Sequence, residues 1–235
     1  MTFNISRVKT GVKGLDEMIE GGLPFPATIL VAGSAGTGKT TLGLQFLTQG
    51  AAEGEKGIYF ATLSEPIQWL LRFTQDFKFM KQEYFGEEIV YVDLGALLKK
   101  TKDFTKVLKV VEENIIEHMP QRIVIDPITV LTKWKGYREF LFDMSISLKN
   151  WETTTMLTGE CEPDQAYPVE VSYVVDGVVL LSTRIGKEGA RQKFLEVMKM
   201  RGTQHITGMH MSNITENGLQ VQIGIGTGGS GAQKL

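Results

Sequence analysis

The sequence predicts an α/β fold, in which a mainly parallel central sheet carries helices on both faces and antiparallel strands follow towards the C-terminus. Two observations lead to this prediction. Short apolar runs alternate with longer stretches of helical spacing through the first two thirds of the chain, which is typical of parallel strands joined by crossover helices. After Asp176 the pattern changes to strand-like runs joined by turns such as Glu216-Asn217-Gly218, which is typical of an antiparallel sheet.

The individual elements follow from the spacing of apolar residues. Short apolar or β-branched runs predict buried strands at 27–32, 57–62, 89–93, 122–126 and 154–158. Apolar residues at helical spacing predict helices at 39–52, 66–77, 104–115 and 139–151, with Asp103 as the N-cap of the third. Four more strands, at 177–184, 193–201, 210–215 and 219–224, are expected to form an antiparallel extension on the sheet edge.

Composition limits the class of protein. The 235 residues carry 25 Lys and Arg against 27 Asp and Glu, so the net charge of −2 argues against a surface coated in positive charge. The single cysteine, Cys161, excludes an internal disulfide framework and a four-cysteine zinc site. No apolar run approaches the roughly 18 residues of a membrane span, and the first residues lack the apolar stretch of a signal peptide. We therefore expect a cytoplasmic protein with no membrane partner, built as one domain over 1–223 and a flexible glycine-rich tail over 224–235.

The strongest motif lies between the first predicted strand and the first predicted helix. It fits the pattern G-x-x-x-x-G-K-[ST] of a phosphate-binding loop and reads Gly33-Ser34-Ala35-Gly36-Thr37-Gly38-Lys39-Thr40, with Thr41 adjoining it. The glycines let the backbone turn its N–H groups around an anion, and the following helix directs its positive end at the same point. Lys39 is expected to contact the β- and γ-phosphates and Thr40 to supply a hydroxyl to Mg²⁺. The loop thus predicts ATP and Mg²⁺ as cofactors, since a strand before it and a helix after it disfavour a plain glycine-rich turn.

Carboxylates at the ends of neighbouring strands are candidates for the rest of the site. Asp126 ends an apolar strand and resembles the aspartate that holds Mg²⁺ beside such a loop. Glu65 follows the strand at 57–62 and is a candidate to orient the attacking water, or else a helix N-terminal carboxylate favoured by the helix dipole. Glu160 is a second candidate polar group near the γ-phosphate.

Several motifs together resemble the KaiC-like ATPases, which are single-domain members of the RecA superfamily, and among them the archaeal RadA paralogues. The resemblance covers roughly residues 6 to 223. Its most specific parts are the KMRGTQH block and the glycine-rich N-terminal motif GLDEMIEGGLP, and the full set, in order, is 14–16 with 21–24, 33–40, 60–66, 122–126, 174–178 and 199–205. It implies a RecA-like core that binds ATP at a subunit boundary and therefore a possible homo-oligomer, as a ring or a filament.

The resemblance also implies residues that act on a neighbouring subunit. Lys199 and Arg201 are expected to approach the γ-phosphate of a neighbour's nucleotide, with Thr203 and His205 nearby. From the residues alone, the same stretch is an edge strand with alternating outward charges. The chain departs from the family in having Ser64 beside Glu65 where two adjacent glutamates are usual, so hydrolysis is expected to be slow.

A loop of mixed composition raises the question of nucleic acid. In the RecA architecture the loop after the strand at 122–126 faces the central axis, and here it combines cations with rings, the mixture that single-stranded DNA needs. Its candidate residues are Lys133, Trp134, Lys135, Tyr137 and Arg138. The alternative is an aromatic pair that covers a neighbouring helix. A second loop, 159–165, is acidic and would repel a phosphate backbone.

Three functions remain open from the sequence. The first is an ATP-dependent protein that binds single-stranded DNA and modulates the RadA recombinase in recombination and repair. The second is a KaiC-like signalling or scaffolding ATPase whose nucleotide state controls self-assembly without DNA. The third is a nucleotide-binding module that barely hydrolyses ATP, which is consistent with Ser64.

Overall fold

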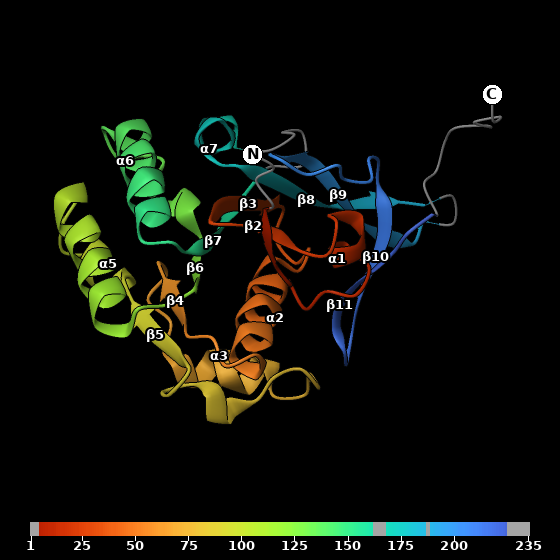
Figure 1. The fold of residues 1–235 in the computed structure, drawn as a ribbon, viewed down its shortest axis with the longest axis horizontal. Helices are drawn as coiled ribbons and strands as arrows, with labels where there is room; N and C mark the ends of the chain where they lie inside the picture. Colours follow the sequence, from red (N-terminus) through yellow and green to blue (C-terminus); the bar gives the residue numbers. More distant parts are fainter. Residues whose placement is uncertain (1–4, 162–167, 187–188, 225–235) are drawn as a thin grey trace.

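A single large sheet runs through the molecule (Figure 1). The computed structural model describes residues 5–161, 168–186 and 189–224, and within them this sheet has nine strands in the order β11-β10-β9-β8-β3-β7-β6-β4-β5. A separate two-stranded sheet pairs β1 (Ser6–Val8) with β2 (Leu23–Phe25) in antiparallel fashion. The predicted glycine-rich tail lies, after Gly224, outside the described residues.

Six adjacent strands of the large sheet are parallel, and β3 lies among them between β7 and β8. Their bounds are β3 (Ala27–Gly33), β4 (Gly57–Ala61), β5 (Ile89–Asp93), β6 (Arg122–Asp126), β7 (Thr154–Glu160) and β8 (Gly177–Ile185). The antiparallel strands are β9 (Arg191–Met200), β10 (His210–Thr215) and β11 (Gly218–Gln222). The predicted α/β class is therefore confirmed, with strand bounds within a few residues of those expected.

The direction of β8 differs from the prediction. We expected 177–184 to start the antiparallel extension, but β8 runs parallel to β3, with Gly177 opposite Ile29 and Leu181 opposite Gly33. The cause is the short helix α7 (Val169–Val174), which the sequence analysis missed and which carries the chain back across the sheet between β7 and β8. A crossover of this kind returns the chain in the same direction, so the antiparallel part begins only at β9.

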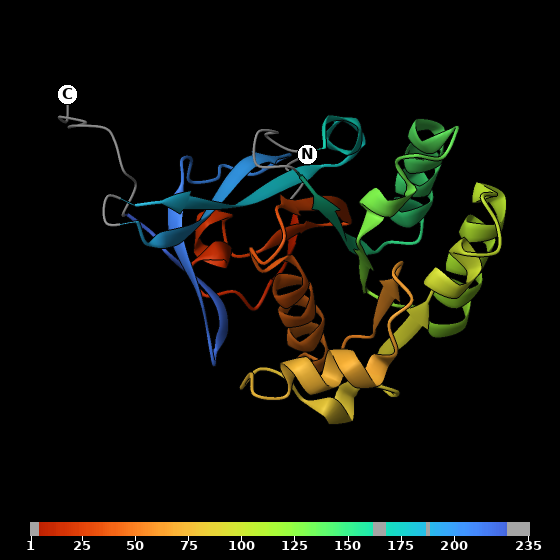
Figure 2. The same ribbon diagram turned by 180° about the vertical axis from the view of Figure 1, so that it is seen from behind.

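Helices cover both faces of the sheet, as Figures 1 and 2 show from opposite sides. One face packs against α1 (Leu15–Met18), α2 (Lys39–Ala52) and α3 (Ile67–Thr74). The other packs against α4 (Gly95–Leu98), α5 (Phe104–His118), α6 (Tyr137–Asn150) and α7. Short 3₁₀ turns, η1 (Gln82–Tyr84) and η2 (Ile128–Leu131), join some of these elements.

The helix starts follow from local chemistry. Asp103 caps α5 as predicted, because its carboxylate accepts the Thr105 backbone N–H at 2.9 Å. Helix α3 is shorter than the expected 66–77, with Pro66 as its N-cap in extended conformation. Helix α6 begins at Tyr137, two residues before the predicted start, after Gly136 in the left-handed region.

Strand β3 divides its side chains between two hydrophobic cores. Ile29 and Val31 face the core of α1, α2 and α3, whereas Leu30 and Ala32 face the core of α5, α6 and α7. This alternation is the two-residue period of a strand, and both sets are apolar because both faces are covered. Both cores therefore fix the position of β3, and the loop that leaves its end starts from a rigid base.

One arginine is buried at the opposite end of the sheet from that loop. Arg122, at the start of β6, is 1% exposed and donates to the carbonyls of Lys9 (2.6 Å) and Phe46 (2.8 Å). It also forms ion pairs with Glu53, at 3.1 Å, and with Glu55. Its guanidinium packs against α2 at Gly50. A Cβ at this position would lie 2.3 Å from Nε, so only glycine allows this close approach.

We expect Arg122→Met to destabilise the fold by about 3–5 kcal/mol, since two carbonyls and two carboxylates lose their donor together. Denaturant unfolding measures this change. The control is Lys9→Ala, which removes the side chain of an exposed 3.8 Å pair with Glu53 and is expected to cost less than about 1 kcal/mol. Equal effects of the two substitutions would contradict the anchoring role of Arg122.

No helix in the described part of the chain is both long enough and apolar enough to cross a bilayer.

Candidate nucleotide site

The predicted phosphate loop connects the end of β3 to the start of α2. Gly36 and Gly38 both have positive φ, 75° and 110°, which side chains rarely adopt. Gly33 is needed for a different reason, because a Cβ there would lie 2.4 Å from the carbonyl oxygen of Leu181 on β8. Helix α2 begins at Lys39, so its unpaired N–H groups and positive dipole end face the loop. The local fold is that of an anion-binding loop.

Lys39 lies within the loop and is 6% exposed. Its ammonium donates to the carbonyls of Gly33 and Ser34, both at 2.9 Å, and forms an ion pair with Glu160 at 2.8 Å. Glu160 is opposite Gly33 in the register of β3 and β7, so its carboxylate reaches the cation at the point where phosphate oxygens would approach. The structure thus brings together the lysine and the second polar candidate.

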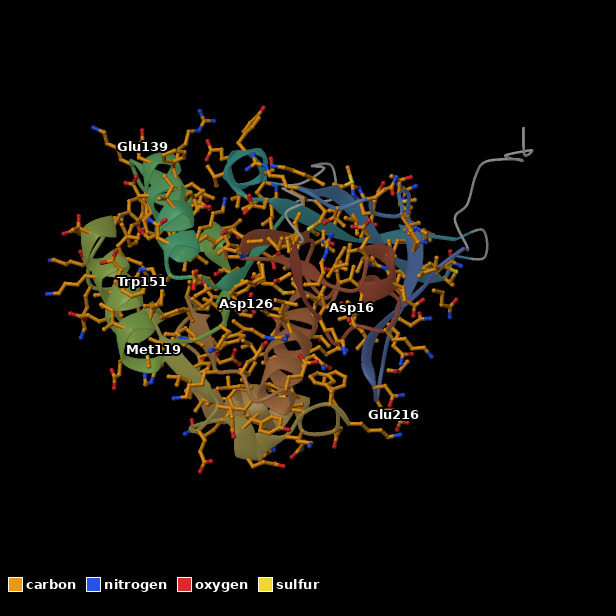
Figure 3. All side chains as sticks on the ribbon, viewed as in Figure 1. Asp16, Met119, Asp126, Glu139, Trp151 and Glu216 are labelled. Atoms are coloured by element: carbon orange, nitrogen blue, oxygen red, sulfur yellow. The ribbon has the colours of Figure 1, made fainter. Side chains whose placement is uncertain are left out.

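Asp126 lies at the end of β6, where Figure 3 labels it, and its carboxylate accepts hydrogen bonds from three hydroxyl groups. Thr40 Oγ1 donates to Oδ2 at 2.7 Å, the Tyr59 hydroxyl donates to the same oxygen at 2.5 Å, and Thr158 Oγ1 donates to Oδ1. Burial and the adjacent Asp126 raise the pKa of Tyr59 well above its ordinary value, so the tyrosine stays a donor. Sequence reasoning missed Tyr59 and Thr158, because each occupies an ordinary strand position.

This carboxylate and the Thr40 hydroxyl supply hard oxygen ligands beside the loop, which suits Mg²⁺ held jointly with phosphates. Among the described residues no group of three or more His, Cys, Asp or Glu side chains could bind a metal without such help. The donor set therefore fits Mg²⁺ carried in with a nucleotide, and does not fit a metal bound by protein ligands alone.

Glu65 belongs to the same pocket. A cavity of about 380 Å³ is lined by loop residues and by Lys39, Thr40, Tyr59, Glu65, Tyr91, Asp126 and Glu160. The Tyr91 hydroxyl donates to the Glu65 carbonyl at 2.5 Å, and its ring stacks on Tyr59 with centroids 5.6 Å apart. Burial, together with nearby carboxylates, raises the pKa of Tyr91 to about 12. The backbone that carries Glu65 is thus tied to Tyr91 on β5.

Ser64 occupies the position where relatives of this type were expected to carry a second glutamate. Its hydroxyl donates to the Asp93 carboxylate at 3.0 Å. A glutamate in this place would face that carboxylate and be repelled by it, so serine fits the local charge.

A cation that sequence reasoning overlooked touches the apex of the loop. Lys193, on β9, donates from Nζ to the Gly36 carbonyl at 2.7 Å. In a trans peptide the C=O and the next N–H point in opposite directions. Because Lys193 holds the Gly36 carbonyl, it also fixes the direction of the Thr37 N–H of the same peptide. Lys193 is 157 residues from Gly36 in the sequence and lies in an ordinary alternating strand pattern, so sequence analysis could not predict this contact.

The expected trans residues have different environments. Lys199 does not project outward, because its ammonium donates to the carbonyls of Ser172 (3.1 Å) and Val175 (2.7 Å) at the C-terminal end of α7. Burial and the nearby Arg201 lower the pKa of Lys199. In the single chain Lys199 therefore contacts α7, and its expected approach to a neighbour's nucleotide stays a prediction. Arg201 has a side chain 60% exposed and contacts Asp176 at 3.1 Å.

Thr203 and His205 follow on the same segment. The Thr203 hydroxyl accepts from Arg7 Nη1 at 2.5 Å. The His205 Nδ1 atom is buried without a hydrogen-bond partner among the described residues. Among the described residues after Met200, Ile214 on β10 lines the phosphate-loop pocket of the same chain, whereas Arg201, Thr203 and His205 do not.

The loop proposed to bind DNA does not present two rings. Tyr137 is 3% exposed and its ring lies 6.5 Å from that of Phe104 on α5. Trp134 is partly buried and lies 5.1 Å from the same ring. Lys133, Lys135 and Arg138 are exposed. The aromatic pair covers a neighbouring helix, which was the alternative interpretation, so Tyr137 as a base-stacking residue is a wrong prediction.

We expect Lys193→Ala to weaken ADP binding about fivefold, because the Thr37 peptide loses the contact that orients it. Titration with a fluorescent ADP analogue measures the dissociation constant. Arg191→Ala removes an exposed cation from the same strand and serves as the matched control. Similar losses in both variants would indicate a general electrostatic effect and contradict the specific role of Lys193.

Comparison with known proteins agrees with this geometry. The family model described as the KaiC ATPase matches residues 8–224. A UPF0273 protein of Thermotoga maritima is 31% identical, over 92% of this chain and 96% of its own length. The circadian clock oscillator protein KaiC of Synechococcus elongatus is 29% identical over 92% of this chain, but the chain spans only 44% of that protein. The crystal structure of the KaiC-like protein PH0186 from Pyrococcus horikoshii OT3 superimposes with a TM-score of 0.81 at 30% identity, covering 93% of this chain and all of that one. The α/β core is RecA-like, and the chain belongs to the KaiC ATPase family.

Proposed function

We propose that the protein is a slow, Mg²⁺-dependent ATPase whose nucleotide lies between two copies of the chain and whose nucleotide state controls self-assembly. The observation that carries the proposal is the convergence of Lys39, Thr40, Asp126 and Glu65 on one cavity of about 380 Å³. These residues come from α2, the end of β6 and the segment after β4, and each supplies a group that phosphoryl transfer to water needs.

Each residue of the chain has a distinct task in this reaction. The backbone N–H groups of the loop and the Lys39 ammonium hold the β- and γ-phosphates. Thr40 and Asp126 would hold Mg²⁺, which when bound neutralises charge on the phosphate oxygens. Glu65 accepts a hydrogen bond from the attacking water and fixes its direction towards the γ-phosphate. Tyr91, through the Glu65 carbonyl, limits the movement of that segment.

The placement of Arg201 supports a site shared between copies. Gly177 pairs with both Ile29 and Met200, whereas the phosphate loop starts at Gly33, four residues further along β3. At about 3.3 Å per residue, Arg201 lies on the order of 13 Å or more from its own loop along the sheet, at the opposite end. An exposed arginine in this place can stabilise transition-state charge only on the nucleotide of another copy.

Two features support slow turnover. A single glutamate, Glu65, is available at the position where relatives of this type were expected to carry two, because Ser64 is engaged with Asp93. In addition, Arg201 serves a nucleotide only when a second copy is present, so an isolated chain lacks that cation.

Single-stranded DNA and the RadA recombinase are not part of the proposal. The loop that suggested single-stranded DNA keeps its cations exposed but has Tyr137 in the core and Trp134 partly covered by Phe104, and no comparison points to a RadA partner. Without accessible rings, the loop loses the stacking contribution of about 1–3 kcal/mol per base that favoured the hypothesis. The proposal therefore follows the KaiC-like alternative, in which the bound nucleotide controls whether copies of the chain assemble.

Glu65→Gln is expected to reduce ATP turnover to background while leaving nucleotide affinity within about twofold of wild type, because the amide no longer accepts the water proton but keeps the side-chain shape. Steady-state phosphate release and ATP titration measure the two quantities. Hydrolysis at the wild-type rate would remove Glu65 from this role, and a loss of ATP binding would show that it acts in the ground state.

Mixing two inactive variants tests the shared site. Glu65→Gln and Arg201→Ala are each expected to be inactive, but an equimolar mixture should recover about a quarter of wild-type turnover, since half the pockets keep Glu65 and half of the apposed copies keep Arg201. The control mixes Glu65→Gln with the double variant, which cannot form a complete pocket. No recovery above this control would contradict a contact between copies.

A further inference from the structure

Arg7, on β1, makes a forked contact with the segment that carries Arg201. Its Nη1 donates to the Thr203 hydroxyl at 2.5 Å, and its Nη2 donates to the Gly202 carbonyl at 3.2 Å. The same Nη2 donates to the Glu20 carboxylate at 2.6 Å, and the Arg7 side chain is 19% exposed. A planar guanidinium bound in this way restrains both position and direction of the groups that it contacts. Arg7 therefore joins three parts of the chain that are distant in sequence.

The glycine-rich N-terminal motif, residues 14–24, supports this arginine. Glu20 adopts φ 58°, a left-handed conformation that non-glycine residues rarely take and that costs of order 1 kcal/mol. Gly22 has φ 150°, and a Cβ there would lie 2.5 Å from the carbonyl oxygen of Val8. The motif thus folds tightly against β1 and holds the Glu20 carboxylate on Arg7. Strain of this kind persists where the surrounding structure fixes a functional geometry.

A second contact comes from the same motif. The Ile206 backbone N–H donates to the Met18 carbonyl at 2.9 Å, at the end of α1. Asp16, labelled in Figure 3 on this part of the molecule, anchors α1 by accepting the backbone N–H and the hydroxyl of Thr10, both at 2.8 Å. The segment 201–206 is therefore held at Gly202 and Thr203 by Arg7 of β1, and at Ile206 by the motif.

On its other side Arg201 is restrained by Asp176. The Asp176 carboxylate accepts from Arg201 Nη1 at 3.1 Å and from Lys149 at 2.9 Å, and its carbonyl accepts the Arg201 N–H at 2.9 Å. The backbone of Arg201 is thus fixed, while its side chain stays mostly exposed. Asp176 thus restrains Arg201 itself, and Arg7 restrains the two residues that follow it.

We propose that Arg7 and Glu20 are positioning residues, which hold segment 201–206 in the geometry that delivers Arg201 to the nucleotide of a second copy. This inference rests on the proposed function. It gives the N-terminal motif a role in the reaction, although neither Arg7 nor Glu20 touches the nucleotide. A cation stabilises a transition state only when it is held close to the developing charge, so a loose segment lowers the rate without changing the chemistry.

Hydrogen exchange of the Thr203 and Ile206 amides tests the restraint directly. We expect both amides to exchange faster in Arg7→Ala than in wild type. Lys9→Ala is the matched control, because it removes a cation two residues away that contacts Glu53 and not the segment. Unchanged exchange in Arg7→Ala would overturn the inference, whatever happens to turnover.

Turnover of the assembled protein tests the catalytic consequence. Arg7→Ala is expected to lower kcat about tenfold with KM and ADP affinity within about twofold of wild type, since its own phosphate loop lies at the other end of the sheet. Arg7→Lys should recover part of the rate, because it restores a charge but not the fork. Wild-type kcat in Arg7→Ala would overturn the inference.

Glu20→Gly separates positioning from simple stability. Glycine adopts the φ of 58° without strain, so the variant is expected to melt close to the wild-type temperature although the Arg7 contact is lost. We expect its kcat to fall several-fold nevertheless. A variant that keeps both its melting temperature and its kcat would show that the pair has no positioning role.

Arg201→Ala, measured beside these variants, distinguishes the two proposals. If it keeps wild-type turnover, the shared site of the proposed function is wrong, and the positioning role falls with it. If it loses turnover while Arg7→Ala and Glu20→Gly keep theirs, the shared site stands and only the positioning inference is overturned.

Discussion

The Asp126 carboxylate is the contact on which the arrangement of the site depends. Three hydroxyls, from α2, β4 and β7, meet on it at the end of β6. The start of the same strand carries Arg122, whose buried guanidinium joins α2 and the N-terminal segment. The five residues of β6 thus join the buried arginine at one end of the sheet to the proposed metal-binding carboxylate at the other. Because both cores pack against β6, its two ends cannot shift independently.

Features that depend on residues close together in the sequence could be predicted. The alternation of strands and helices, the cap at Asp103 and the loop before Lys39 could all be predicted, since period, capping and glycine-rich turns depend on near neighbours in the chain. Contacts between distant elements were harder to foresee. Tyr59 occupies a normal strand position, and nothing in the sequence indicates that its hydroxyl meets Asp126 sixty-seven residues later.

The wrong prediction for Tyr137 has a physical cause, which is that the ring it packs against lies on a distant element. Phe104 on α5 packs against Trp134 and Tyr137, so the two rings that were expected to stack on bases lie against a helix of the same chain. Helix α7 uses Lys199 at its C-terminal end, where carbonyls without intrahelical partners favour a cation. A mixed cationic and aromatic pattern is therefore weak evidence for a ligand until the packing of its rings is known.

Three charged groups of the proposed reaction already have partners within the chain. Lys39 contacts Glu160, Arg201 contacts Asp176, and Asp126 accepts the Thr40 hydroxyl. Nucleotide binding and assembly would therefore exchange internal contacts for new ones, and only the difference in free energy would favour the complex. A charged group that has a partner both in the free chain and in the assembly loses little hydration on binding. It also gains little interaction free energy, which agrees with a slow enzyme. In the proposed shared site the same exchange would couple the two events, because Arg201 would leave Asp176 only for a site that a nucleotide has made negative.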